Sequence, residues 1–132
     1  MRNTKIVLPL LFAAAVTAPF LINAQPAGFK RIPIQRADLS VPGREVVQAV
    51  AELPAGMSVG RHTHPGEEVS YVLEGTVILL IDGQPPREVK AGEGFVIPAG
   101  VVHDAKVAGD KGSRVLATYI VEKGKPLATP AP

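Results

Sequence analysis

The sequence has 132 residues, with 14 lysines and arginines against 12 aspartates and glutamates, and no cysteine. This length suits one domain and is short for two, and the absence of cysteine excludes disulfides and thiol chemistry. The first 24 residues carry two of the basic side chains and no acidic one, so the remainder is balanced in charge and gives no electrostatic reason to expect nucleic acid as a partner.

Residues 1–24 have the layout of a secretory signal peptide. Two basic side chains precede an apolar run over 6–16, and Ile22 and Ala24 stand at the −3 and −1 positions of a possible cleavage site. The alternative is an uncleaved membrane anchor, but prolines interrupt the apolar segment, which is also short for a span. We therefore expect an exported protein, periplasmic or secreted, with no membrane attachment after cleavage.

The segment after the leader is rich in proline and lacks a sustained hydrophobic period. Residues 25–44 contain three prolines, which favours an N-terminal arm with one short extended piece around Ile32–Ile34. Residues 123–132 combine glycine, proline and lysine, which is typical of a flexible, solvated tail. The folded domain is therefore predicted to span 45–122.

Within that domain, valine- and isoleucine-rich segments alternate with glycine and proline. This pattern is typical of an all-β protein with many short strands. The Asp-Gly step at 82–83 indicates a hairpin turn. Extended segments are predicted at 45–53, 57–64, 68–75, 76–82 and 113–122, with three shorter ones between 87 and 107. Eight or nine strands without a convincing helix fit an antiparallel barrel or jelly roll.

The segment 76–81 is apolar on both of its alternating sets of side chains. A strand with one solvated face should alternate more cleanly, so we expect its outer face to be covered as well. Either the arm at 25–44 or a second subunit can supply that cover, and a homodimer is the oligomer we expect.

Three histidines and one glutamate have the spacing of metal ligands. His62 and His64 leave an extended chain on the same side, because side chains at i and i+2 share a face. After the turn at Pro65-Gly66, Glu68 can return opposite this pair, and His103 can join it from a neighbouring strand. Three imidazoles and one carboxylate suit one divalent transition metal ion, namely Fe, Mn, Ni or Zn, and suit Ca or Mg poorly.

These residues match the two signature motifs of the cupin superfamily. The first motif, G-x5-H-x-H-x3,4-E-x6-G, is matched at every position by Gly56, His62, His64, Glu68 and Gly75. The resemblance covers about 45–122 and implies a cupin jelly-roll barrel with a metal held by His62, His64, Glu68 and His103.

The second motif, G-x5-P-x-G-x2-H-x3-N, is matched by Gly92, Pro98, Gly100 and His103, while Val107 stands where the family has asparagine. This departure leaves the proposed ligands untouched. Only 16 residues, 76–91, separate the two motifs, and this short spacer is typical of microbial single-domain cupins.

Cupins include enzymes and binding proteins, so the resemblance leaves the activity open. The leading hypothesis is a metal-dependent enzyme acting on a small organic substrate, with dioxygenase-like chemistry because the first motif resembles that of quercetin-dioxygenase-like cupins. That resemblance implies that Glu68 can also serve as a base. The alternative is a non-catalytic periplasmic module that binds a ligand or a metal.

The strand phase also assigns the neighbours of the ligands. Ser70 shares the phase of Glu68 and can line the cavity, although most such residues only pack. Glu67 and Asp104 each adjoin a ligand in sequence, so they should point the other way and lie exposed. Arg61 and Tyr71 also fall on the opposite phase.

Overall fold

The computed structural model describes residues 27–132. The predicted signal peptide, residues 1–24, lies outside the described residues. The described chain contains strands, turns and bends but no helix, and accordingly no helix in it is long and apolar enough to cross a membrane.

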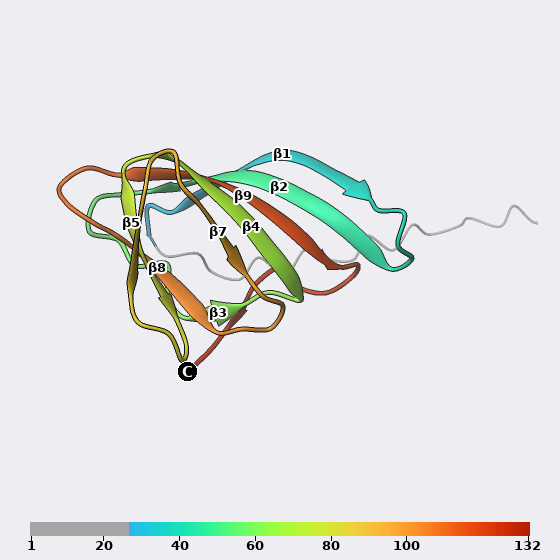
Figure 1. Cartoon of the computed structure of the whole chain (residues 1–132). Helices are drawn as coiled ribbons and strands as arrows, with labels where there is room; N and C mark the ends of the chain where they lie inside the picture. The colour runs from blue at the N-terminus through green and yellow to red at the C-terminus, as the bar shows by residue number, and fades with distance from the viewer. Residues whose placement is uncertain (1–26) are drawn as a thin grey trace, which may run out of the picture.

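Ten strands form two antiparallel five-stranded sheets (Figure 1). One sheet has the order β1-β2-β9-β4-β7 and the other β10-β3-β8-β5-β6. The strands are β1 (Lys30–Asp38), β2 (Arg44–Leu53), β3 (His62–Thr63), β4 (Gly66–Glu74), β5 (Thr76–Ile81), β6 (Arg87–Lys90), β7 (Gly94–Ile97), β8 (His103–Val107), β9 (Ser113–Glu122) and β10 (Thr129–Pro130). The all-β jelly-roll prediction is confirmed.

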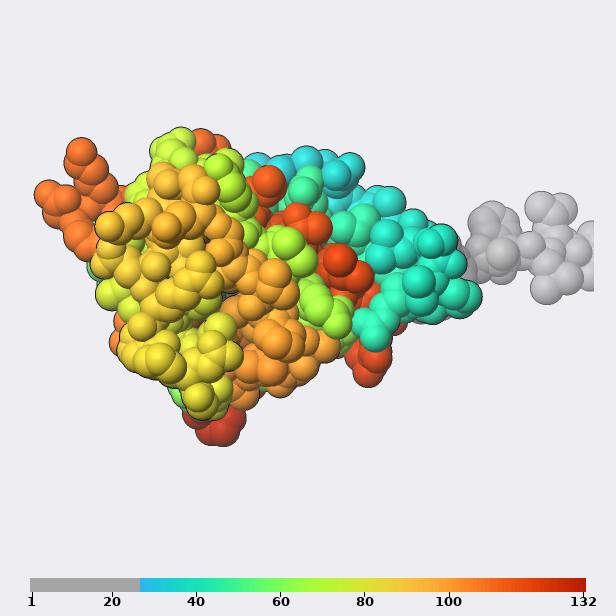
Figure 2. All heavy atoms as spheres, in the orientation of Figure 1, coloured from blue at the N-terminus to red at the C-terminus, as the bar shows by residue number. Residues whose placement is uncertain are grey.

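The core lies between the two sheets and follows from the alternation of their sequences. Along β9, every second residue from Ser113 to Val121 is buried, as expected for a strand with one inner face. Val115 of β9 pairs with Val72 of β4, and both pack against Val77 of β5 across the interior. The turn between β1 and β2 projects beyond this body at one end of the molecule (Figures 1 and 2).

Glycine is required at several turns between strands. Gly56, Gly75 and Gly92 have φ of +69°, +77° and +91°, a region that other residues occupy at a cost. Gly94 does not have positive φ. A Cβ there would instead lie 3.1 Å from the carbonyl oxygen of Ser70, so this glycine is explained by close approach of the backbone.

The N-terminal arm forms more structure than the sequence indicates. Residues 30–38 form the whole of β1, which pairs with β2 through a register shift between Pro33 and Gln35. This strand belongs to the other sheet from β5, so it does not supply a cover for the outer face of β5. Cover by a second subunit stays a prediction.

The C-terminal segment contains a short strand that the sequence does not indicate. Residues 129–130, expected to lie in a solvated tail, form β10 and pair with β3. Leu127 packs against the buried cluster that contains Tyr119. The segment is therefore attached to the strand that carries His62.

An ion pair across β1 and β2 should make stability depend on pH. Arg36 donates from Nε and Nη2 to the two carboxylate oxygens of the buried Glu45, at 2.7 and 2.6 Å. These hydrogen bonds hold the pKa of Glu45 below its ordinary value of 4.5, against the effect of burial. The pair therefore stabilises the fold above pH 4.5, and its contribution is lost as pH falls through the lowered pKa.

We expect Glu45→Gln to lower the free energy of unfolding at pH 7 by about 1 kcal/mol, since half of the Arg36 side chain is exposed and its charge is screened. Urea unfolding at pH 7 and pH 3 tests this expectation, because the difference between the two proteins should shrink at pH 3. The exposed Glu67→Gln serves as control. An equal difference at both pH values would show that the charge of Glu45 contributes nothing.

Candidate metal centre

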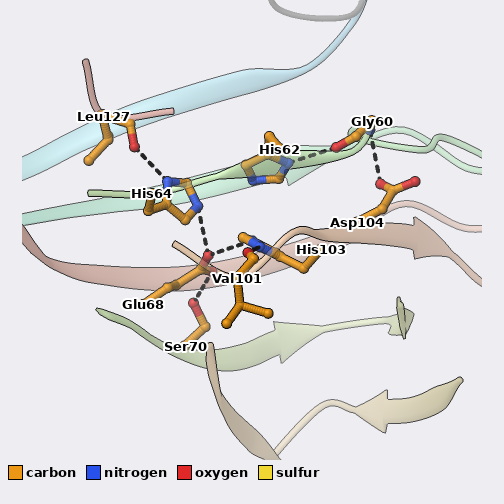
Figure 3. Close-up of polar contacts among 9 residues, drawn as sticks. All are labelled: Gly60, His62, His64, Glu68, Ser70, Val101, His103, Asp104 and Leu127. Carbon is orange, nitrogen blue, oxygen red and sulfur yellow. Dashed lines mark hydrogen bonds and ion pairs between the residues drawn. The ribbon is translucent and has the colours of Figure 1, made fainter. Parts of the chain in front are cut away.

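Four side chains from both sheets meet inside the molecule (Figure 3). His62 in β3 lies directly opposite His103 in β8 as an antiparallel pair, and His64 follows two residues later. Glu68 comes from β4 in the other sheet. The structure thus brings together all four residues that the sequence predicts as ligands, and one ring nitrogen of each histidine lies within 4.8 Å of the others.

Each histidine is oriented by a backbone carbonyl. The Nδ1 atoms of His62, His64 and His103 lie 2.7, 2.6 and 2.9 Å from the carbonyl oxygens of Gly60, Leu127 and Val101. Because a carbonyl can only accept, Nδ1 carries the proton and Nε2 keeps a lone pair. A metal-binding histidine is usually held in this way by a second group.

The lone pairs face the carboxylate of Glu68. Its Oε2 atom lies 3.0 Å from Nε2 of His64 and 3.4 Å from Nε2 of His103, while Oε1 accepts a hydrogen bond from Ser70 at 2.6 Å. Both of these Nε2 atoms are buried without a hydrogen-bond partner. Lone pairs and a carboxylate oxygen at these distances repel each other unless a cation lies among them, so the residues fit a metal ion of the type that accepts nitrogen and oxygen ligands.

The electrostatics of the site also favour a bound cation. Burial lowers the pKa of His62 to about 4, so its imidazole is neutral at pH 7. Burial alone would raise the pKa of Glu68, but His103 and His64 outweigh it and hold this pKa well below the ordinary range. For His103, burial is outweighed by Glu68 and the pKa is raised. The carboxylate is therefore ionised and attracts positive charge.

The site opens into a small cavity between the sheets. Its volume is about 40 Å³, enough for a few water molecules. Glu68 is the only carboxylate among the described residues that line it, and the wall is otherwise mostly apolar. Sequence reasoning missed two polar residues of this wall, Tyr119 and Arg31, which come from strands whose register only the fold determines.

The neighbours of the ligands follow their strand phase, but one of them is buried where the sequence predicts exposure. Glu67 is exposed, as predicted. Tyr71, predicted to lie on the opposite phase from the ligands, is exposed as well, and Ser70 is buried and donates a hydrogen bond to Glu68. The prediction that Asp104 is exposed is wrong, since only 5% of its surface is accessible. It does point away from the ligands, but it accepts hydrogen bonds there from Ser58 Oγ at 2.5 Å and from the Gly60 amide at 2.9 Å.

Asp104 therefore fixes the loop that orients a ligand. The amide of Gly60 donates to Asp104 while the carbonyl of the same residue accepts from His62. The strand phase correctly indicates which side of β8 carries Asp104. It cannot indicate that residues 58–60 cover this side.

Removing the C-terminal segment should weaken metal binding. The carbonyl of Leu127 is the partner of His64 Nδ1, and loss of such a partner typically lowers metal affinity about 10- to 100-fold. We expect deletion of 127–132 to lower zinc affinity within this range, as measured by competition with a chelating dye. Leu127→Ala keeps the carbonyl and is the matched control. Unchanged affinity after the deletion would contradict this role of the segment.

The fold and this constellation define an all-β jelly roll with a histidine-rich centre between its sheets. A family model described as "Cupin domain" matches residues 49–119, more than half of the chain. The chain therefore belongs to the cupin family.

Two curated relatives come from Ruegeria pomeroyi, and the chain spans less than half of each. It is 37% identical to dimethylsulfoniopropionate lyase DddQ over 54 residues, which is 41% of this chain and 27% of the relative. It is 38% identical to dimethylsulfoniopropionate lyase DddW over 71 residues, which is 54% of this chain and 45% of the relative.

Solved structures share the fold. The crystal structure of the same lyase DddQ superposes with a TM-score of 0.60 at 26% identity, over 65% of this chain and 43% of that one. A salicylate 1,2-dioxygenase from Pseudaminobacter salicylatoxidans gives a TM-score of 0.51 at 19% identity, over 56% of this chain and 20% of that one. The second likeness concerns the fold alone.

Proposed function

We propose that this protein is a metal-dependent cupin enzyme that acts on a small organic substrate. The observation that carries the proposal is the convergence of three imidazole lone pairs and an ionised carboxylate beside an internal cavity. His62, His64, His103 and Glu68 would hold one divalent transition metal ion. Such an ion supplies Lewis acidity and a template that orients substrate.

Within this proposal Glu68 has a second role, as the catalytic base. It is the only carboxylate that lines the cavity among the described residues. The hydroxyl of Tyr119 suits the opposite role of donor, because burial and the charge of Glu68 raise its pKa, against the effect of Arg31. A base and a donor in one cavity allow a proton to be removed at one end of a substrate while the other end is held.

Elimination is the reaction class that we place first. Both curated relatives are named as lyases of dimethylsulfoniopropionate. An elimination would break a carbon–heteroatom bond, remove the proton from the adjacent carbon and leave a double bond. Dioxygenase-like chemistry, expected from the sequence, comes second, since the likeness to a dioxygenase concerns the fold alone.

The working environment is part of the same proposal. We infer export to the periplasm or beyond, on the basis of the leader-like residues 1–24. A homodimer is supported by Val69, Tyr71 and Val96, which expose 43, 47 and 57% of their surface on neighbouring strands. Light scattering of the purified protein tests the dimer, and fractionation of the native host tests export.

Turnover decides between an enzyme and a binding module. The protein is loaded in turn with Fe(II), Mn(II), Ni(II) or Zn(II). In one assay it is incubated with dimethylsulfoniopropionate, and the release of dimethyl sulfide is measured by gas chromatography. In a second assay it is incubated with catechols and flavonols, and oxygen uptake is measured with an electrode. We expect sulfide release with at least one metal and none with His62→Ala/His64→Ala.

The other outcomes are equally informative. Oxygen uptake without elimination would favour the dioxygenase reading. Stabilisation by a compound that is never turned over would favour the non-catalytic module. This alternative is supported by the presence of only one carboxylate among the described residues that line the cavity.

A further inference from the structure

Arg31 extends from the N-terminal arm into the interior of the domain. It lies in β1 opposite Ala51 of β2, which in turn pairs with Val115 of β9. The side chains of Arg31, Ala51 and Ala117 all line the cavity that contains the metal centre. The two alanines are small, and they leave room for a long side chain to cross the inner face of the sheet.

The guanidinium group has no anionic partner among the described residues, although a side-chain hydrogen bond joins it to the hydroxyl of Tyr119. Its Nε atom is buried without a hydrogen-bond partner, and Arg31 forms no ion pair within residues 27–132. Its Cζ atom lies 5.3 and 5.8 Å from the ring centroids of Phe29 and Tyr119. By contrast, Arg36 on the same strand is paired through two hydrogen bonds with Glu45.

A buried guanidinium nitrogen without a hydrogen-bond partner is costly, so the unpartnered Nε of Arg31 points to a ligand at this position. The only carboxylate among the described cavity residues, Glu68, already faces His64, His103 and Ser70. Arg31 lines the same cavity as Glu68 and His103, so the cation and the metal centre share one cavity. The site thus has a cationic group without an anion, placed apart from the ligands.

We propose that Arg31 binds the carboxylate of a small organic acid whose other end lies at the metal centre. A guanidinium group can bind a carboxylate through two parallel hydrogen bonds, and a cavity of about 40 Å³ limits the acid to a short chain. This inference rests on the proposed function and narrows its substrates to small carboxylates. It makes the N-terminal arm a part of the binding site.

The test separates the charge of Arg31 from the metal. Binding of propionate and of its uncharged analogue propionamide is measured by ligand-observed NMR, on metal-free protein prepared with EDTA and on protein loaded with Zn(II). The variants are Arg31→Gln, Arg31→Lys and the matched control Lys30→Gln, which removes an exposed charge from the same strand. Thermal melting confirms that each variant is folded.

We expect the wild type and Lys30→Gln to prefer propionate over propionamide, with or without zinc. Arg31→Gln should bind propionate roughly tenfold more weakly or worse, while Arg31→Lys should keep the preference at an intermediate affinity because an ammonium group cannot form the paired bonds. The Lys variant supports or contradicts the proposal even if the Gln variant is unfolded.

Two results would overturn the inference. One is propionate binding by Arg31→Gln at wild-type strength; the other is a wild type that does not distinguish the acid from the amide. A third result would be a preference for propionate that is abolished by His62→Ala/His64→Ala but not by Arg31→Gln. It would show that the carboxylate binds to the metal ion and not to Arg31. This would contradict the inference about Arg31 while leaving the proposed enzyme function unaffected. Loss of the preference in Arg31→Gln, in a protein without turnover, would support a carboxylate-binding module.

Discussion

Replacing His62 and His64 together by alanine will abolish transition-metal binding. The wild type is expected to carry about one metal ion per chain, because one ring nitrogen of each histidine lies within 4.8 Å of the others and Oε2 of Glu68 lies 3.0 and 3.4 Å from Nε2 of His64 and His103. The double variant keeps only His103 and Glu68, and we expect its affinity to fall by more than about a hundredfold, since both lost groups are ligands and not merely their partners. Elemental analysis of dialysed protein measures the result.

A suitable control variant removes a charge next to the metal site without removing any of the proposed ligands. Glu67→Gln is suitable because Glu67 adjoins Glu68 in sequence but is exposed, and this variant should retain the full metal content. Without metal, the double variant should be less stable than the metal-free wild type, because it loses the Nδ1 hydrogen bonds of His62 and His64 to the carbonyls of Gly60 and Leu127. Absence of metal from the wild type as well would refute the proposed centre.

The sequence predicts the fold and the ligands well because both depend on local patterns. The alternation along 113–122 identifies an inner face before any partner is known, and the spacing of His62, His64 and Glu68 is set by one strand, one turn and the next strand. His103 is more distant in sequence, yet the second motif places it. For these residues little depends on the register between strands far apart in the sequence.

The parts that the sequence does not predict all depend on long-range pairing. Leu127 supplies the carbonyl for His64 across 63 positions of the chain, and its segment has the composition of a tail. Asp104 is buried because another loop covers it. Arg31 lines the cavity because β1 pairs with β2, whereas its own segment shows no hydrophobic period. In each case the residue's role is determined by the element that packs beside it.

Gly66→Ala is expected to disrupt the domain although it adds a single methyl group. Gly66 begins β4 and pairs with Val121 of β9. A Cβ at this position would lie 2.0 Å from the carbonyl oxygen of Ile120 and 2.7 Å from the Cα of Val121, and backbone atoms cannot move aside as the end of a side chain can. The two strands must separate, so we expect a loss of roughly 3 kcal/mol or more in the free energy of unfolding.

Gly83→Ala provides the comparison. Gly83 lies in the turn after β5 with φ of +79° and has nothing within 4 Å of an added Cβ, so its replacement should cost only about 1 kcal/mol from the strained backbone. Urea unfolding of both variants without metal measures the difference. Because β4 also carries Glu68 two residues after Gly66, a Gly66→Ala protein that still folds should bind zinc more weakly than Gly83→Ala. Equal stability of the two variants would mean that β4 and β9 separate at this point without cost, and that the close approach does not fix the position of Glu68.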